Sequence, residues 1–190
     1  VADGAWRQAG SEVPMDAFPV EFQKTAYPLP YRHEVEAAAT AGGVDWSLVA
    51  AVAREESRWN PRALSVVGAR GLVQLMPATA AAVADRLGMP APTHADLFDP
   101  LTSLRLGAAE LGRVVAEFDG RMAPAIAAYN AGGPQARLWL AQCGPNCSDE
   151  LFVANISFGA TRNYTSTVLE GASVYSKLYE KAAPRSAVSD

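Results

Sequence analysis

A glutamate, Glu56, stands near the end of a segment, residues 46–57, whose apolar residues recur with helical periodicity. On a helix that advances about 100° per residue, the apolar face carries Leu48, Val49, Val52 and Ala53. Glu56 falls near the middle of this face, whereas Glu55 lies toward its edge. A buried carboxylate is costly unless it is paired or protonated, and desolvation raises its pKa. A raised pKa suits a general acid at neutral pH, so Glu56 is a candidate catalytic acid.

A structural interpretation of Glu56 is open as well. Its carboxylate could cap the end of the helix, or it could pair with Arg54 or Arg58 on the surface. Helical phase alone does not choose between these interpretations.

The two cysteines, Cys143 and Cys147, lie close together in the segment Cys-Gly-Pro-Asn-Cys. The two histidines, His33 and His94, show no metal-ligand spacing to this pair, and a thioredoxin-type motif has two intervening residues instead of three. We therefore expect a disulfide across a Gly-Pro turn, which implies an oxidising compartment, although a pair of free loop thiols is the alternative. We expect no metal site.

The amino-acid composition of the chain excludes some classes of function. The chain has 190 residues, 49% hydrophobic and 19% charged, with a net charge of −4 and a pI near 5.2. A nucleic-acid binder normally has a basic surplus, so we expect no nucleic-acid partner. No stretch approaches the length of a transmembrane helix. No export signal opens the chain as given, so we expect any such signal to have been removed or not to be included in this sequence.

The elements that must position these residues are mainly helices. We expect an extended N-terminal arm or linker over residues 1–30, which hold four prolines, one domain over 31–180, and a tail over 181–190. The predicted helices cover residues 33–41, 46–57, 77–87, 101–118, 122–130, 135–141 and 161–180, and Asp45, Asp99 and Thr161 are their candidate N-caps. Residues 64–73 are predicted to be a short β region or a loop.

Five ordered motifs surround and follow Glu56. They are Glu56-Ser57-Arg58-Trp59-Asn60-Pro61, Ser65-Val66-Val67-Gly68-Ala69-Arg70-Gly71-Leu72-Val73-Gln74-Leu75-Met76-Pro77, Asp96-Leu97-Phe98-Asp99-Pro100, Ala127-Ala128-Tyr129-Asn130-Ala131-Gly132 and Thr161-Arg162-Asn163-Tyr164. In this order and spacing, the set resembles the catalytic domain of the soluble lytic transglycosylases of bacterial cell walls. The resemblance extends from about Tyr27 to about Tyr179, which is most of the chain.

The resemblance implies a fold and a reaction. The fold would be mainly α (an α+β, lysozyme-like fold), a single helical domain with a glycan-binding groove and at most a short β region. The reaction would be non-hydrolytic cleavage of the β-1,4 bond between N-acetylmuramic acid and N-acetylglucosamine in peptidoglycan, which gives a 1,6-anhydromuramyl end. The family's single catalytic carboxylate maps onto Glu56, first as general acid and then as base, and no metal or organic cofactor is implied.

The residues agree with a one-carboxylate mechanism. Glycosidases that use their own nucleophile or base need two positioned carboxylates. No second acid stands in the irregular stretch 61–77, and Asp96 and Asp99 are more typical of a helix-capping turn. The nucleophile would then come from the substrate, first the muramic N-acetyl group and then the C6 hydroxyl.

Further site residues follow from the same resemblance. Matching positions predict substrate binding by Ser65, Gln74, Met76, Tyr129, Asn130 and Tyr164. In the family, the tyrosine hydroxyl that corresponds to Tyr129 approaches the catalytic carboxylate. Structural interpretations stay open: Ser65 as a loop serine, Met76 as a core residue, and Tyr129 as a buried residue with an unrelated hydrogen-bond partner. Gly68, Gly71 and Gly132 are expected to permit tight turns, and Trp59 and Trp139 are expected in the core.

The chain departs from the family pattern at three places. Ala160 stands where a glycan- or peptide-binding glutamate is usual, Val73 replaces a methionine, and Gly132-Gly133-Pro134 replaces Gly-Pro-Gly. Two alternative functions are therefore kept, a lysozyme-like hydrolase and a non-catalytic glycan-binding envelope domain. In each case we expect a monomer in the periplasm or cell envelope whose partner is the peptidoglycan glycan strand.

Overall fold

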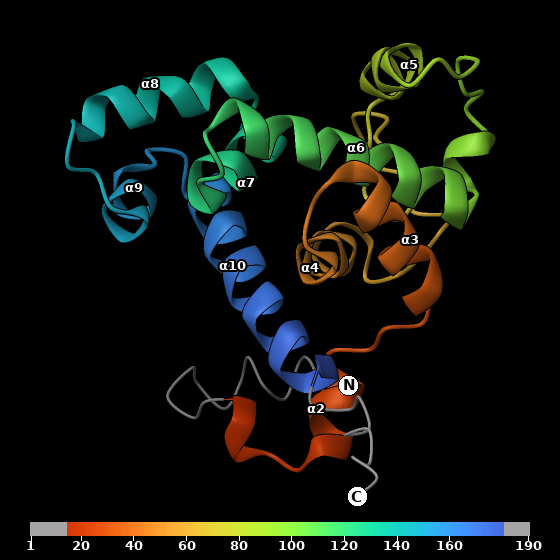
Figure 1. Ribbon diagram of the computed structural model, residues 1–190, viewed down its shortest axis with the longest axis horizontal. Coiled ribbons are helices and arrows are strands. Elements are labelled where there is room, and N and C mark those ends of the chain that lie inside the picture. Colours follow the sequence, from red (N-terminus) through yellow and green to blue (C-terminus); the bar gives the residue numbers. More distant parts are fainter. Residues whose placement is uncertain (1–14, 181–190) are drawn as a thin grey trace, which may run out of the picture.

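The computed structural model describes residues 15–180, and these residues are mainly helical (Figure 1). In chain order the elements are η1 (Met15–Ala17), α2 (Val20–Ala26), α3 (Arg32–Gly42), α4 (Trp46–Ser57), α5 (Pro77–Arg86), η2 (Asp96–Phe98), α6 (Pro100–Glu117), α7 (Met122–Ala131), α8 (Gly133–Cys143), α9 (Asp149–Asn155) and α10 (Gly159–Glu180). Within this part of the chain, extended pairing is limited to two isolated antiparallel bridges, Leu64 with Arg70 and Arg70 with Leu75. The predicted fold class, helical with at most a short β region, is confirmed.

Two long helices frame the molecule. Figure 1 shows α10 extending from α7 and α9 at one end to α2 at the other, and α6 extending across the top from α7 to α3. Helix α4 lies between them and packs on both. The larger hydrophobic core surrounds α4, and a smaller one joins α7, α8 and α9 around the buried Trp139 and Phe152. The prediction of Trp59 and Trp139 as core residues is also confirmed.

Helix α4 begins and ends on local signals that the sequence carries. The Asp45 carboxylate accepts a hydrogen bond from the Ser47 amide at 2.7 Å, which satisfies one of the unpaired amides of the first turn. The helix ends where Arg58 and Trp59 adopt left-handed backbone angles, with φ of 53° and 63°. The side chains from Leu48 to Ala53 are all buried, so the carboxylate of Glu56 follows a helix segment embedded in the core.

The contact between α3 and α6 depends on two glycines. A Cβ at Gly42 would lie 2.5 Å from the carbonyl oxygen of Ala108, and one at Gly112 would lie 2.0 Å from that of Gly42. Both distances are far below van der Waals contact, so the two backbones touch directly. This contact sets the position of α6, which carries one wall of the cavity that Glu56 lines.

The N-terminal segment is not an extended arm where the structure describes it. Residues 20–26 form α2, with Pro19 at its N-cap and Pro28 just beyond its end, so the prolines bound a helix instead of preventing one. The segment packs onto α10: the hydroxyl of Tyr175 donates to the Pro28 carbonyl and that of Tyr179 to the Tyr27 carbonyl, both at 2.8 Å. The remainder of the predicted arm, 1–14, and the predicted tail, 181–190, lie outside the described residues.

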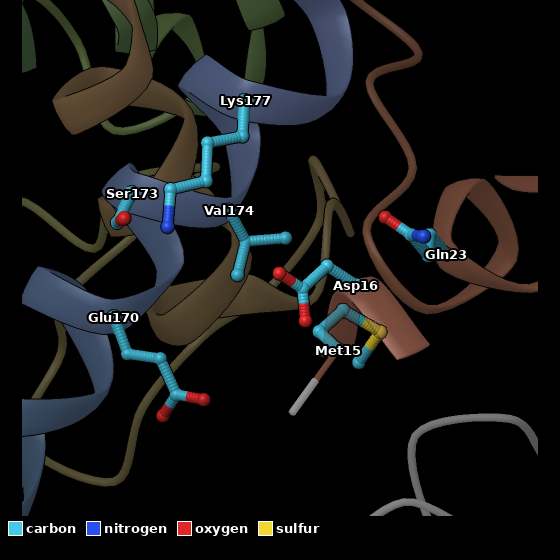
Figure 2. A pocket seen from close by; sticks show the side chains of 7 residues that line it. All are labelled: Met15, Asp16, Gln23, Glu170, Ser173, Val174 and Lys177. Atoms are coloured by element: carbon cyan, nitrogen blue, oxygen red, sulfur yellow. The ribbon is translucent and has the colours of Figure 1, made fainter. Parts of the chain in front are cut away.

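A cavity of about 250 Å³ remains between this N-terminal segment and α10 (Figure 2). Asp16 and Gln23 border it on one side, and Glu170, Ser173 and Lys177 of α10 border it on the other. The Gln23 amide nitrogen donates to the Phe18 carbonyl at 2.7 Å, so it serves the turn between η1 and α2.

The cysteine segment forms the expected disulfide. Cys143 ends α8 and is bonded to Cys147 across a Cα–Cα distance of 5.4 Å. The following helix, α9, is absent from the sequence prediction because its seven residues are too few to show helical periodicity. Arg121 fixes its start by donating to the Asp149 carboxylate at 2.7 Å and to the Cys147 carbonyl at 2.8 Å.

The three N-cap predictions have different outcomes. Asp45 and Asp99 cap α4 and α6, and the Asp99 carboxylate accepts from the Thr102 amide at 2.8 Å. The prediction for Thr161 is wrong, because α10 begins two residues earlier, at Gly159. The Thr161 side chain is buried, and its hydroxyl donates a hydrogen bond to Asn130 instead of capping the helix.

No helix among residues 15–180 is both long and apolar enough to cross a membrane.

Candidate active site

Glu56 accepts a hydrogen bond from a residue far away in the sequence. Its Oε1 lies 2.8 Å from the hydroxyl of Tyr164, which is on α10 and only 8% exposed. The packing of α4 against α10 brings the two residues together. Tyr164 therefore holds the carboxylate in one orientation at the end of α4.

The surroundings of Glu56 favour its protonated form. Burial raises its pKa from 4.5 to about 7, the hydrogen bond from Tyr164 partly offsets this rise, and the nearby charge of Glu55 adds to it. A group with a pKa near 7 is present in both protonation states at neutral pH. Glu56 can therefore donate a proton and take one back under the same conditions.

The irregular stretch after α4 is held in shape by hydrogen bonds of its own side chains. The Ser65 hydroxyl accepts from the Ala69 amide at 2.9 Å, and the Gln74 amide nitrogen donates to the carbonyls of Ala63 and Gly71 at 3.0 and 2.9 Å. Gly71 is required, because it has a φ of +78° and a Cβ there would lie 2.0 Å from the Leu97 carbonyl oxygen. Gly68 and Gly132 also have positive φ values, which confirms the expected turns.

Tyr129 and Asn130 are anchored beside the same cavity. The Tyr129 hydroxyl donates to the Val73 carbonyl at 2.9 Å, and burial raises its pKa well above 10, as do the nearby charges of Glu56 and Glu110. The direct hydrogen bond to Glu56 comes from Tyr164, whereas the resemblance had indicated the hydroxyl of Tyr129. Asn130 Oδ1 accepts from the Thr161 hydroxyl at 2.8 Å.

One cavity of about 400 Å³ joins most of the predicted site residues. Glu56 lines it together with five of the predicted substrate-binding residues, namely Ser65, Gln74, Met76, Tyr129 and Asn130. Tyr164 is not part of the lining and contacts the cavity only through Glu56. Cys143 and Cys147 are also outside the lining, since α8 reaches the cavity only at its first residue, Gly133.

The sequence analysis missed two charged residues of this cavity, Glu110 and Arg113 on α6. Glu110 is buried, and its oxygens accept from Arg86 at 2.6 Å and from Arg113 at 2.8 Å. The signal was present: Glu110 lies on the apolar face of α6, four residues after Leu106 and four before Val114. The test of helical phase that selected Glu56 would have selected Glu110 as well.

The acidic groups of this cavity have their partners inside the protein. Glu56 accepts from a tyrosine hydroxyl, and Glu110 accepts from two guanidinium groups. Among residues 15–180, no three His, Cys, Asp or Glu side chains lie close enough together to hold a metal ion.

Comparison with known proteins identifies similar sequences and folds. The sequence model of the Transglycosylase SLT domain family matches residues 34–150. A putative soluble lytic murein transglycosylase of Haemophilus influenzae is 32% identical over 95% of the chain, and the soluble lytic murein transglycosylase of Escherichia coli is 35% identical over 75%. The alignments cover only 30% and 22% of those two proteins, so the chain spans less than a third of their length.

A solved structure shows the same fold. The lytic transglycosylase Slt of Pseudomonas aeruginosa, determined as an inactive mutant, superposes with a TM-score of 0.79 at 34% sequence identity. The match covers 85% of this chain and 26% of that protein.

Proposed function

The chain belongs to the Transglycosylase SLT domain family, and we propose that it is a peptidoglycan lytic transglycosylase. The reaction would cleave the β-1,4 bond between N-acetylmuramic acid and N-acetylglucosamine without water and leave a 1,6-anhydromuramyl end. The observation that carries this proposal is the desolvated Glu56, with a pKa of about 7, at the wall of an open cavity. The proposed substrate is the glycan strand of peptidoglycan, in the periplasm or cell envelope.

The first step breaks the glycosidic bond. Protonated Glu56 donates its proton to the bridging oxygen, and the N-acetylglucosamine side leaves as an alcohol. Positive charge develops at C1 of the muramic residue, and the carbonyl oxygen of its own N-acetyl group attacks that carbon. Ser65, Gln74, Met76, Tyr129 and Asn130 would bind the sugars from the cavity walls, and Tyr164 would orient Glu56.

The second step closes the anhydro ring. The C6 hydroxyl of the muramic residue attacks C1, the bond to the N-acetyl oxygen breaks, and Glu56, now a carboxylate, accepts the hydroxyl proton. Glu56 returns to its protonated state, so one side chain serves both steps and its pKa near the working pH suits both roles.

Glu110 favours a second candidate, a lysozyme-like hydrolase. It is another carboxylate lining the cavity of Glu56, and two-carboxylate glycosidases use such a group as nucleophile or base. Against this role, the guanidinium groups of Arg86 and Arg113 occupy both of its oxygens and stabilise its negative charge. A carboxylate held in this way is a weak nucleophile, so we rank the transglycosylase first.

The domain limits are also part of the proposal. We place the catalytic domain over residues 31–180, and the packing of α2 against α10 supports including residues back to 15 in the same folded unit.

Product analysis tests the proposed reaction. The 190-residue chain would be incubated with purified sacculi, and the released muropeptides would be analysed by mass spectrometry. We expect muramyl ends one water lighter than the reducing form, and a Glu56→Gln control that releases none. Reducing ends would support the hydrolase instead, and no release by the wild type would contradict both enzymatic functions.

A further inference from the structure

A chain of ion pairs extends along the α6 wall of the cavity. Glu110 pairs with Arg86 of α5 and with Arg113, Arg113 also pairs with Glu117 at 2.5 Å, and Glu117 pairs with Arg137 of α8. Gly133 allows this last pair to approach the backbone, because a Cβ there would lie 2.7 Å from Glu117 Oε1. The network thus joins α5, α6 and α8 along one side of the cavity.

The arginines of this network are more exposed than their acidic partners. The side chains of Glu110 and Glu117 are 12% and 21% exposed, whereas those of Arg113, Arg86 and Arg137 are 39%, 45% and 55% exposed. The two carboxylates are therefore the more buried groups of the network, and the three guanidinium groups are closer to the solvent. Three positive and two negative groups leave a surplus of one positive charge, although the chain as a whole carries −4.

Arg113 is the arginine of this network that lines the cavity, as Asn130 and Gly133 do. Glu110 accepts from its Nε and Nη2 and Glu117 accepts from its Nη1, so the two carboxylates fix the orientation of the guanidinium. A guanidinium has five N–H groups in a planar fork, and two of those on Arg113 are not used in these bonds. An oriented guanidinium with free N–H groups suits the geometry of a carboxylate ligand.

We propose that Arg113, held by Glu110 and Glu117, binds a carboxylate of the peptide attached to the muramic residue. This inference rests on the proposed function, since it names the part of the peptidoglycan that this wall recognises. The N-acetyl sugars of the strand are uncharged, so the attached peptide is where intact peptidoglycan carries carboxylates near the groove. Where the peptide has been removed, the lactyl group has a free carboxylate, and this second source is separated in the test.

The experiment measures binding by calorimetry to the Glu56→Gln variant, which leaves the ligand intact. Three ligands carry the muramic residue: a two-repeat glycan with peptides, the same glycan with its peptide carboxylates amidated, and the glycan without peptides. A fourth, chitotetraose, reports binding of neutral sugar alone. We expect amidation to weaken binding about tenfold, as for the loss of one charge-assisted hydrogen bond.

Protein variants locate the effect. In the Glu56→Gln background, Arg113→Gln should lower affinity for the peptide-bearing glycan about tenfold and leave chitotetraose binding unchanged. Arg113→Lys keeps the charge without the fork and should lose part of that affinity. Arg105→Gln is the matched control, because Arg105 is exposed on α6 outside the cavity lining. It should change none of the affinities.

Several outcomes would overturn the inference. Equal affinity for the amidated and free-carboxylate peptides would do so without any change to the protein, even if Arg113→Gln did not fold. An equal loss for all four ligands would mean that Arg113 only supports the wall, and an Arg113 dependence limited to the peptide-free glycan would assign the lactyl carboxylate instead. If the Glu56→Gln variant bound none of the glycans and the wild type cleaved none, the result would contradict the proposed function itself, and this inference with it.

Discussion

Two carboxylates line the same cavity in opposite surroundings. Glu56 lies at the end of the buried helix α4 and accepts a hydrogen bond from a neutral tyrosine hydroxyl, and burial raises its pKa to about 7. Glu110 lies on α6 with the guanidinium groups of two arginines against its oxygens. The same chemical group is thus left poorly solvated at one wall and compensated by cations at the other.

The comparison indicates how one fold assigns different tasks to identical side chains. A carboxylate that can exchange a proton near neutral pH needs a hydrogen-bond partner without a positive charge, whereas a carboxylate that positions arginines needs charged partners on its oxygens. Which of the two acids performs the chemistry therefore depends on their partners. Changing these groups and their partners one at a time tests this dependence.

Replacement of the proton donor should have the largest effect. Glu56→Gln should reduce the release of muropeptides by more than the roughly 10²–10⁴-fold typical for loss of one general acid, because the amide can neither donate the proton nor accept it back. Glu55→Gln is the matched control on the same helix and should retain most of the activity. Turnover of sacculi by Glu56→Gln at the wild-type rate would remove Glu56 from the mechanism.

The same variant should be more stable than the wild type at high pH. The folded chain keeps the Glu56 proton up to about pH 7, whereas the unfolded chain releases it near 4.5. The free energy of unfolding of the wild type therefore falls between these pH values through this group. Glu56→Gln should show no such fall, so its advantage should grow from near zero at pH 4 to at most about 3 kcal/mol at pH 8. Denaturant titrations of both proteins at these pH values measure it, and a constant difference would contradict the burial of the charge.

Replacement of the compensated carboxylate should affect stability more than chemistry. Glu110→Gln leaves two half-exposed arginines that water can solvate, so we expect a loss of about 1–2 kcal/mol in the free energy of unfolding and less than tenfold in activity. Glu36→Gln removes the exposed partner of Arg32 and serves as the surface control, with almost no expected change. If Glu110→Gln lost as much activity as Glu56→Gln, the two-carboxylate hydrolase would become the better mechanism.

Removal of the tyrosine hydroxyl should shift a pH profile. The hydrogen bond from Tyr164 stabilises the charged form of Glu56, so Tyr164→Phe should raise the pKa of Glu56 above about 7. The alkaline limb of kcat/KM, expected near pH 7 in the wild type, should move upward by about one unit. Tyr129→Phe removes a hydroxyl bound to the Val73 carbonyl instead, and its limb should stay in place even if binding weakens.

The disulfide lies outside both regions, and its removal should have the smallest effect on activity. Replacement of Cys143 and Cys147 by serine opens a short ring, so the free energy of unfolding should fall by at most about 2–3 kcal/mol. Activity at a temperature where the variant is folded should match the wild type, because the cavity meets α8 only at its opposite end. Loss of activity at unchanged stability would instead place this loop in contact with substrate.

The sequence predicted the elements whose signals are local. Helices α4 and α6 are long, periodic and begin at Asp45 and Asp99, so propensity, periodicity and capping agree. Helix α9 is short and depends on Phe152 packing against the smaller core and on the contacts of Arg121, which no single-sequence pattern reports. The arm was misjudged for a similar reason, because aromatic contacts with α10 stabilise α2.

The residues of the candidate site also fall into two groups, those with a local sequence signal and those that only the packing of the helices brings together. Helical phase and motif identified Glu56, and resemblance supplied Ser65, Gln74 and Asn130, which the fold gathers at one cavity. Motifs could not tell which tyrosine touches the carboxylate, because that depends on the crossing of α4 and α10. The ion pairs of Glu110 join helices that are distant in sequence, so only the packed structure shows them.

The glycine contact between α3 and α6 has a consequence for how the cavity can evolve. Because neither Gly42 nor Gly112 has room for a single methyl group, any larger residue must push the two helices apart. Helix α6 carries Glu110 and Arg113, so such a change would shift the charged wall relative to Glu56 without altering any residue of the site. The width of the cavity thus depends on two positions, Gly42 and Gly112, that do not line it.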